Sequence, residues 1–158
     1  MHLAGYSMGA VVAVLAAAED ERVSRLVVGG IGAGAVEVGG LDTRVMPPEL
    51  VSAALTAEDA ADAPERTRAF RVLADTAGCD RLALAAQIRA VHRDALPLDR
   101  IAVPTLVLAG ESDPLATRPQ VLASAIAGAE LTVLPGDHLT AVRDPGFAAS
   151  IAEFLSRG

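Results

Sequence analysis

The chain has 158 residues, of which 52% are hydrophobic and only 3% aromatic, and 20 acidic against 13 basic residues give it a net charge of −7. This length is sufficient for one globular domain whose core is built from alanine, valine and leucine. The acidic balance argues against nucleic acid or an anionic membrane as a partner. The single cysteine, Cys79, predicts no internal disulfide, a cytoplasmic location and a buried, inert thiol. The apolar run over residues 8–18 is too short for a bilayer and follows no basic segment, so we expect neither a signal peptide nor a membrane anchor.

The first recognisable motif is the pentapeptide Gly5-Tyr6-Ser7-Met8-Gly9, which has the form G-x-S-x-G. A short strand is predicted before the serine and a helix over residues 8–18 after it. In such a nucleophile elbow the serine occupies a tight strand-to-helix turn, and the small residues two before and two after it avoid a collision across that turn. Five-residue patterns recur by chance, so the rest of the chain has to supply the partners of the serine.

Next in the chain, residues 25–28 form a short β-branched run that Gly29 and Gly30 close, which predicts a buried strand. We expect residues 31–40 to be irregular. Residues 30–35 fit the dinucleotide-binding pattern G-x-G-x-x-A. No helix clearly opens there and no acidic residue ends a second strand about 20 residues later, so a connecting loop is the simpler interpretation.

From Pro47 the hydrophobic pattern becomes helical for roughly fifty residues, which predicts three short helices. Pro47 and Pro48 open the first helix. Pro64 opens the second, with Phe70 and Leu73 directed inward and Gly78 as its end. Asp80 caps the third helix.

The last third returns to alternating strands and helices. Residues 104–110 and 131–134 are predicted strands, and residues 118–127 form a helix between them. Asp144 and Pro145 are a cap and a first-turn proline for a final helix. Strands separated by helices indicate a parallel sheet covered on both faces, an α/β fold.

Three of the predicted strands end in a loop that carries a reactive side chain. Asp113 follows residues 104–110, His138 follows residues 131–134, and Ser7 follows the first strand, so all three lie at the same edge of the sheet. A serine hydroxyl needs a base, and the base needs an acid that orients it. Glu111 and Asp137 are rival acids, of which Asp137 is adjacent to His138 in sequence.

The other two histidines are weaker candidates. His2 lies on the elbow strand and is interpreted as structural, and His92, on the third helix, as a surface or packing residue. No histidine or cysteine cluster has the spacing of metal ligands, so we predict no metal and no cofactor.

With Gly5-Tyr6-Ser7-Met8-Gly9, residues 106–114 and residues 135–138, the sequence resembles the α/β-hydrolase family over nearly its whole length. The order serine, acid, histidine is that of this family. The resemblance implies Ser7 as nucleophile, His138 as general base, Asp113 as its orienting acid and the Met8 N–H as an oxyanion donor. It also implies residues 1–40 and 98–158 as parts of one α/β core and residues 41–97 as a helical cap. Candidate substrate-binding residues are Tyr6, Met46, Leu50, Phe70, Leu73 and Ile88, although apolar stripes of this kind are more often plain core.

Members of the family place roughly half of their sheet, and the loop with the second oxyanion donor, before the elbow. This chain has neither, so we expect a partial fold of about four strands paired in sequence, with the elbow strand as an exposed edge. Either Met1 is an internal methionine taken as a start, which we favour, or the chain is a remnant that needs a partner.

The sequence therefore predicts a serine hydrolase that acts on a small or medium apolar ester or related carbonyl compound through an acyl-enzyme. A lyase, a C–C hydrolase or a cofactor-free haloperoxidase of the same fold is an alternative. A second alternative is a weakly active or inactive remnant. Such a remnant would associate with another chain, such as a second copy, through its open edge.

Overall fold

The computed structural model describes residues 1–157, which form two compact units. Residues 1–42 and 92–157 form an α/β unit, and Thr43–Val91 form a helical unit. The division falls close to the cap boundaries of residues 41 and 97 that the resemblance implies.

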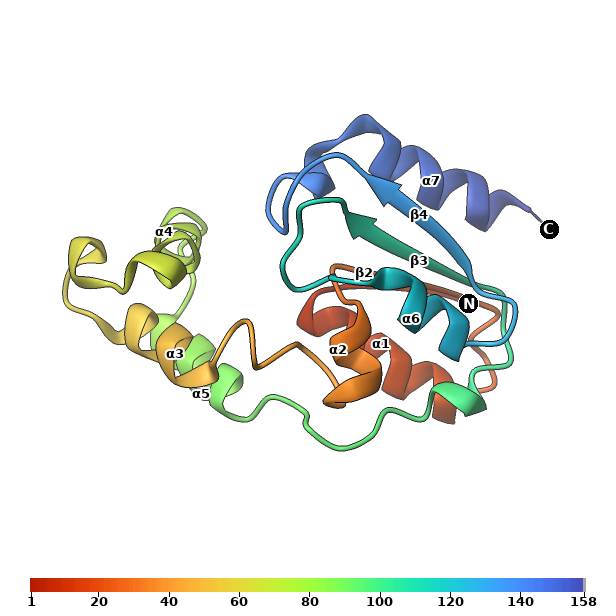
Figure 1. The fold of residues 1–158 in the computed structure, drawn as a ribbon, viewed down its shortest axis with the longest axis horizontal. Helices are drawn as coiled ribbons and strands as arrows, with labels where there is room; N and C mark the ends of the chain where they lie inside the picture. The colour runs from red at the N-terminus through yellow and green to blue at the C-terminus, as the bar shows by residue number, and fades with distance from the viewer. Residues whose placement is uncertain (158) are drawn as a thin grey trace. The chain divides into compact units, whose positions relative to one another are not determined.

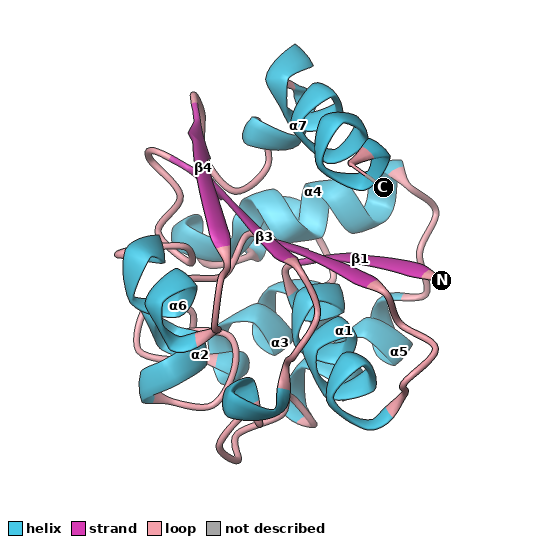
Figure 2. Ribbon diagram, turned by 90° about the vertical axis from the view of Figure 1, so that its right-hand side faces the viewer, coloured by secondary structure: helices cyan, strands magenta, loops and turns pink. Residues whose placement is uncertain are grey.

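The α/β unit is built around one sheet of four parallel strands in the order β1-β2-β3-β4. Its strands are β1 (His2–Tyr6), β2 (Arg25–Gly29), β3 (Thr105–Gly110) and β4 (Glu130–Leu134). Its helices are α1 (Met8–Glu19), α2 (Ala33–Glu37), α6 (Pro119–Ala125) and α7 (Pro145–Ser156), with short 3-10 turns at Leu98–Arg100 and Ala141–Arg143. Figure 1 shows the strands side by side, and Figure 2 shows α7 on one face of the sheet with α1 and α6 on the other. The predicted sheet of about four parallel strands paired in sequence order is confirmed.

The interior of the sheet follows from the apolar runs of the sequence. All six residues of β3 are buried, and in β2 only Arg25 is partly exposed. On the face covered by α7, Val27, Leu106 and Leu108 pack with Leu134 and Phe154. Strands that are buried on both faces have continuous rather than alternating apolar sequences, and this is why β2 and β3 were predictable.

The edge position of β1 is confirmed as well. β1 pairs with β2 along its whole length, from His2 opposite Arg25 to Tyr6 opposite Gly29, and it is the outermost strand of the sheet. Its burial alternates, with His2 and Ala4 exposed. β1 therefore leaves one row of its backbone groups unpaired within the sheet.

Two helices of this unit begin or end near the capping residues that the sequence predicts. The Asp144 carboxylate accepts a hydrogen bond from the Gly146 N–H at 2.7 Å, with Pro145 in the first turn of α7. α6 ends at Ala125, two residues before the predicted end, and Gly128 follows with a φ of 70°.

The prediction that residues 31–40 are irregular is wrong, because Ala33–Glu37 form the short helix α2. The Ala33 N–H donates to the Thr117 carbonyl oxygen at 2.9 Å, so a tertiary contact holds the first turn. A Cβ on Gly32 would lie 2.8 Å from the Ala116 oxygen, and one on Gly34 would lie 2.8 Å from the Asp42 Cβ. These glycines thus serve close packing within the chain, which a local pattern does not reveal.

The helical unit contains α3 (Pro48–Thr56), α4 (Arg68–Thr76) and α5 (Arg81–Arg89), with 3-10 turns at Ala60–Asp62 and Glu65–Thr67. The three predicted helices are confirmed. The Asp80 carboxylate caps α5 by accepting from the Leu82 and Ala83 N–H groups, and Gly78 after α4 has a φ of 64°. The core of this unit consists of Val51, Leu55, Ala74 and Ala85, against which Met46, Phe70, Leu84 and Ile88 pack.

Three placements in or beside this unit differ from the expectations. Leu73 is exposed rather than inward, because α4 directs Phe70, Arg71 and Ala74 to the core. The buried Arg71 guanidinium donates hydrogen bonds to carbonyl oxygens of α3 and of the turn that follows α3. Cys79 is exposed, since it lies in the short turn between α4 and α5. His92 lies beyond the end of α5 and not on it.

Among residues 1–157 no helix is both long and apolar enough to cross a membrane.

Candidate active site

Ser7 occupies the turn between β1 and α1 in a strained conformation. Its φ is 56° and its ψ is −122°, which is rare for a residue with a side chain. Its N–H donates to the Gly29 carbonyl oxygen at 2.8 Å, so the end of β2 anchors the turn. This geometry lifts the Ser7 side chain out at the carboxyl end of the sheet.

The two glycines of the pentapeptide are not equivalent. A Cβ on Gly5 would collide with the carbonyl oxygen of Gly9, whereas a Cβ on Gly9 would meet nothing within 4 Å. The expectation that both positions require a small residue therefore holds for Gly5 and is wrong for Gly9, because the side-chain direction of Gly9 points to open space.

Asp113 and His138 lie in the loops after β3 and β4, and both are buried, with 3% and 7% of their surface exposed. One Asp113 carboxylate oxygen accepts from the Leu115 N–H at 2.8 Å, and the other is 2.9 Å from His138 Nδ1. The backbone and the imidazole together thus fix the orientation of the carboxylate.

The three side chains form one chain of hydrogen bonds, since His138 Nε2 is 2.8 Å from Ser7 Oγ. A carboxylate only accepts, so Nδ1 carries the proton that is donated to Asp113, and the lone pair of Nε2 accepts the Ser7 hydroxyl proton. The structure thus brings together the three residues for which the resemblance implies catalytic roles. In this tautomer the imidazole can take a proton from the hydroxyl.

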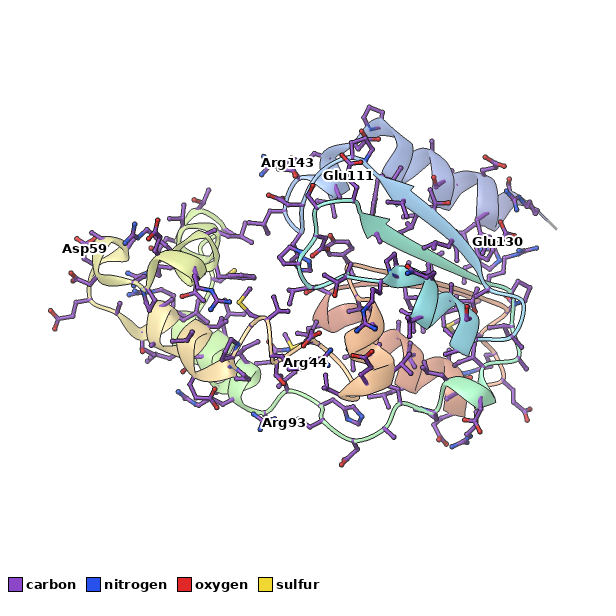
Figure 3. The ribbon with its side chains drawn as sticks, in the orientation of Figure 1. Arg44, Asp59, Arg93, Glu111, Glu130 and Arg143 are labelled. Atoms are coloured by element: carbon purple, nitrogen blue, oxygen red, sulfur yellow. The ribbon has the colours of Figure 1, made fainter. Side chains whose placement is uncertain are left out.

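The two rival acids are exposed, whereas Asp113 is buried. Asp137 Oδ1 accepts from the Thr140 hydroxyl at 2.7 Å and from the N–H groups of Leu139 and Thr140, and these bonds, the hydroxyl first, lower the pKa of this exposed carboxyl. Glu111 lies directly past the end of β3, at the same carboxyl edge of the sheet as the site and opposite Glu130 at the start of β4 (Figure 3), but it is the Asp113 carboxylate that is 2.9 Å from His138 Nδ1. Asp113 is therefore the carboxylate at Nδ1.

Tyr6, a predicted substrate-binding residue, is joined to His138. Its hydroxyl donates to the His138 carbonyl oxygen at 2.9 Å, and its ring centroid is 5.2 Å from that of the imidazole. Burial raises the pKa of the Tyr6 phenol, and the charges of Asp113 and Asp137 add to this. The phenol is therefore a hydrogen-bond donor throughout the neutral pH range.

The remaining predicted residues belong to separate parts of the chain. Met8 is the first residue of α1, so its N–H has no acceptor within the helix and is free by position to face an oxyanion. In the helical unit Met46, Phe70 and Ile88 pack against the core, Leu50 is partly buried and Leu73 is exposed. A role of these five residues in substrate binding stays a prediction. Within residues 1–157 no group of three or more histidine, cysteine or acidic side chains is arranged to hold a metal ion.

A shallow apolar groove of about 170 Å³ lies on the α7 side of the sheet beside β1. Its lining residues are Ala4, Gly5, Tyr6, Val27, Gly29, Leu108, Phe147 and Ile151. Neither Ser7 nor His138 lines it, so this groove is distinct from the space in front of the hydroxyl.

Sequence reasoning missed the contact between Tyr6 and His138. The two residues are 132 positions apart, and no periodicity connects them. The glycine pair at positions 29 and 30 was available as a signal, because two residues without side chains at the end of a strand beside the elbow leave room for an aromatic ring.

No family model matches the sequence, and none of the curated proteins does. Solved structures do match. A hydrolase from Pseudomonas aeruginosa is 31% identical, with a TM-score of 0.72 over 98% of this chain and 64% of that one. An enol-lactonase from Burkholderia xenovorans is 26% identical, with a TM-score of 0.69 over 99% of this chain and 65% of that one. An α/β hydrolase from a deep-sea metagenome library is 22% identical, with a TM-score of 0.72 over 98% of this chain and 64% of that one.

These similarities, together with the sheet order and the serine turn, establish the class of fold: the chain has an α/β-hydrolase fold and is similar to enzymes of that family. It spans slightly less than two thirds of the length of the three proteins.

Proposed function

We propose that the chain is a serine hydrolase that cleaves a small or medium apolar ester or related carbonyl substrate through an acyl-enzyme. The observation that carries this proposal is the chain of hydrogen bonds from Ser7 Oγ through His138 to Asp113, with heavy-atom distances of 2.8 Å and 2.9 Å. Similarity to a hydrolase and to an enol-lactonase supports an acyl-transfer reaction.

In the first half of the proposed reaction, Ser7 Oγ attacks the carbonyl carbon while its proton moves to His138 Nε2. The negative charge that develops on the carbonyl oxygen is stabilised by the Met8 N–H at the start of α1. The C–O bond to the alcohol then breaks, and Nε2 returns the proton to the leaving oxygen. In the second half, water attacks the acyl-Ser7 ester, transfers a proton to Nε2, and the acid leaves as Ser7 regains its hydroxyl proton.

The experiment is hydrolysis of short p-nitrophenyl esters by the wild-type chain and by Ser7→Ala. A matched control is Ser24→Ala, because Ser24 precedes β2 at the opposite end of the sheet, where its hydroxyl donates to the Met1 carbonyl oxygen. We expect Ser24→Ala to hydrolyse at the wild-type rate and Ser7→Ala to lose the rate above background. Equal rates for wild type and Ser7→Ala would remove Ser7 as the nucleophile.

A second candidate function is association of two copies through β1, and the open edge of this strand favours it. The segment His2-Leu3-Ala4-Gly5-Tyr6 has no Lys, Asp, Glu, Pro or bulge, which are the features that usually protect an exposed edge from pairing. Two such edges related by a twofold axis can pair with each other, and the apolar groove beside β1 adds contact area. Sedimentation velocity at several concentrations tests this, with Ala4→Arg as the variant that blocks the edge; a monomer at all concentrations would contradict it.

The lone, reduced cysteine supports a cytoplasmic location as part of the same proposal.

A further inference from the structure

We propose that Tyr6 is a positioning residue, which holds the backbone of the base His138 in register with the strand that carries the nucleophile Ser7. This inference rests on the proposed function. It replaces the expectation that Tyr6 binds substrate with a role that acts through His138.

The contacts of Tyr6 join the strand that carries Ser7 to the loop that carries His138. Tyr6 is the last residue of β1 and directly precedes Ser7. Its hydroxyl donates to the His138 carbonyl oxygen at 2.9 Å, and its ring lies against the imidazole at an angle of 36°. The ring also forms a T-shaped contact with Phe147 of α7, with a centroid distance of 5.7 Å. One side chain thus joins the nucleophile strand, the base loop and a helix on the sheet face.

The topology makes such a link necessary. Asp113 and His138 follow β3 and β4, which are neighbours, and the two loops are tied by backbone bonds such as Ser112 N–H to the Gly136 oxygen at 3.0 Å. Ser7 follows β1, which two strands separate from β4. The acid and the base are therefore positioned locally, whereas the distance from base to nucleophile depends on contacts across the end of the sheet.

The end of β2 has the shape that this contact requires. A Cβ on Gly29 would lie 2.8 Å from Tyr6 Cδ2. A Cβ on Gly30 would lie 2.7 Å from Tyr6 Cζ and 3.0 Å from His138 Cε1, and Gly30 has a φ of 69°. The absence of side chains at both positions leaves the two rings room to meet above the strand that separates β1 from β3.

The phenol is suited to a permanent role as donor. Because burial and two nearby carboxylates disfavour the phenolate, Tyr6 keeps its proton over the range in which ester hydrolysis is measured. A peptide carbonyl only accepts hydrogen bonds, so the Tyr6 hydroxyl and the His138 oxygen form a matched pair.

The test compares Tyr6→Phe, which removes the hydroxyl and keeps the ring, with the wild type. Misplacement of a catalytic group by about 1 Å costs on the order of 100-fold in rate, so we expect kcat to fall about 10- to 100-fold. KM should stay within about twofold, because in this account Tyr6 does not bind substrate. An unchanged kcat, or a change confined to KM, overturns the proposal, and the second result would return Tyr6 to substrate binding.

The matched control is Thr105→Val. Thr105 is buried at the start of β3, and its hydroxyl also donates to a backbone carbonyl oxygen, that of Val103 at 2.9 Å. This variant loses a comparable hydrogen bond at the opposite end of the sheet, so it should lose stability without a change in kcat. A loss of kcat equal to that of Tyr6→Phe would mean that any such destabilisation lowers the rate, and it would overturn the positioning role.

A readout without turnover separates this inference from the proposed function. The chain has three histidines, so the downfield Nδ1–H proton of His138 can be assigned by NMR with His138→Gln as the reference. We expect this resonance to shift or broaden in Tyr6→Phe and to remain unchanged in Thr105→Val. An unchanged resonance in Tyr6→Phe overturns the inference even if Ser7 hydrolyses no ester, whereas the absence of Ser7-dependent hydrolysis alone overturns only the proposed function.

Gly29→Ala is the second variant, which is needed if Tyr6→Phe does not fold. Its Cβ would press on the Tyr6 ring from a position in regular strand backbone, and the nearest atoms are those of Tyr6 and Leu108. It should lower kcat and alter the His138 resonance in the same sense as Tyr6→Phe. Wild-type kcat and an unaltered resonance in Gly29→Ala would contradict the proposal.

Discussion

β3 and β1 are parallel strands of one sheet, yet the molecule holds them in different ways. All six residues of β3 are buried, and β2 and β4 flank it on either side. β1 pairs with β2 alone in the sheet, and its burial alternates. The proposed acid follows β3 and the proposed nucleophile follows β1. The proposed acid is therefore positioned by a buried central strand, whereas the proposed nucleophile is positioned by a strand at the edge of the sheet.

The contacts around the two strands explain how a site can nevertheless form. β3 is fixed by hydrophobic packing on both faces, with Leu106, Val107 and Leu108 at most 2% exposed. β1 is fixed by its ladder to β2, by helix α1 that follows it, and by the Tyr6 hydroxyl on His138. Substitutions in β3 should therefore act mainly on stability, and those at the end of β1 mainly on the geometry of Ser7.

The largest expected effect is on catalysis and falls on the acid after β3. Asp113→Asn keeps the shape but presents an amide to Nδ1, which favours the wrong imidazole tautomer, and we expect kcat to fall by about 10³- to 10⁴-fold. Asp137→Asn is the matched control, because its carboxylate is bonded within its own loop. Steady-state hydrolysis of a p-nitrophenyl ester measures both. Similar losses in the two variants would contradict the assignment of Asp113.

The next effect is on stability and compares the two strands directly. Leu108→Ala removes a side chain that is 1% exposed, so it should lower the free energy of unfolding by about 2–5 kcal/mol. Leu3→Ala in β1 removes a partly exposed leucine and should cost less than half as much. Urea unfolding followed by the fluorescence of Tyr6, the single tyrosine of a chain without tryptophan, reports on the α/β unit. Equal losses would show that β1 is as firmly packed as β3.

A smaller effect on stability tests the serine turn. Gly5→Ala forces a Cβ against the Gly9 carbonyl oxygen, and such overpacking costs about 1–3 kcal/mol. Gly9→Ala meets open space within the first turn of α1, where alanine is favoured over glycine by about 0.5–1 kcal/mol, so this variant should be neutral or more stable. Thermal unfolding of the two variants is the measurement. If Gly9→Ala is as unstable as Gly5→Ala, the geometry described for the turn is wrong.

The smallest effect concerns the phenol at the end of β1 at alkaline pH. Burial and nearby carboxylates raise the pKa of Tyr6 in the folded chain above the usual value of a tyrosine, so the folded state holds this proton more tightly than the unfolded state does. The resulting stability is fully present below the unfolded pKa and is lost as pH rises above it. Between about pH 9 and about pH 11 the urea midpoint of the wild type, followed by circular dichroism, should therefore fall more steeply than that of Tyr6→Phe.

Phenolate absorbance provides the independent reading of this prediction, because no other tyrosine contributes. The folded protein should show little phenolate at a pH at which the urea-unfolded chain is half ionised. Identical titration curves for the folded and unfolded chain would mean that Tyr6 is open to water, and the contact with His138 would then lose its support.

The sequence was informative wherever one segment decides the structure. Apolar runs predicted β2, β3 and β4, and proline and aspartate at helix starts predicted α3, α5 and α7. The loops after parallel strands share one edge, so Ser7, Asp113 and His138 could be grouped before any distance was known.

It was less informative wherever contacts between distant segments decide. Helix α2 depends on a hydrogen bond to the Thr117 carbonyl oxygen. Helix α4 buries Arg71 and exposes Leu73 because backbone carbonyl oxygens accept hydrogen bonds from the Arg71 guanidinium. The contact of Tyr6 with His138 joins residues whose sequences carry no shared pattern. The sequence also does not show which glycines are sterically required, since a Cβ would clash at Gly5 and would meet open space at Gly9.

The most direct test of the central claim, that His138 and Asp113 activate Ser7 on its edge strand, is covalent labelling with a fluorophosphonate followed by mass spectrometry of the digested protein. We expect the wild-type chain to carry the label on the peptide that contains Ser7, Ser7→Ala to carry none, and Asp113→Asn to react at least about 100-fold more slowly. Labelling of a different residue, or equal labelling of wild type and Ser7→Ala, would contradict the account.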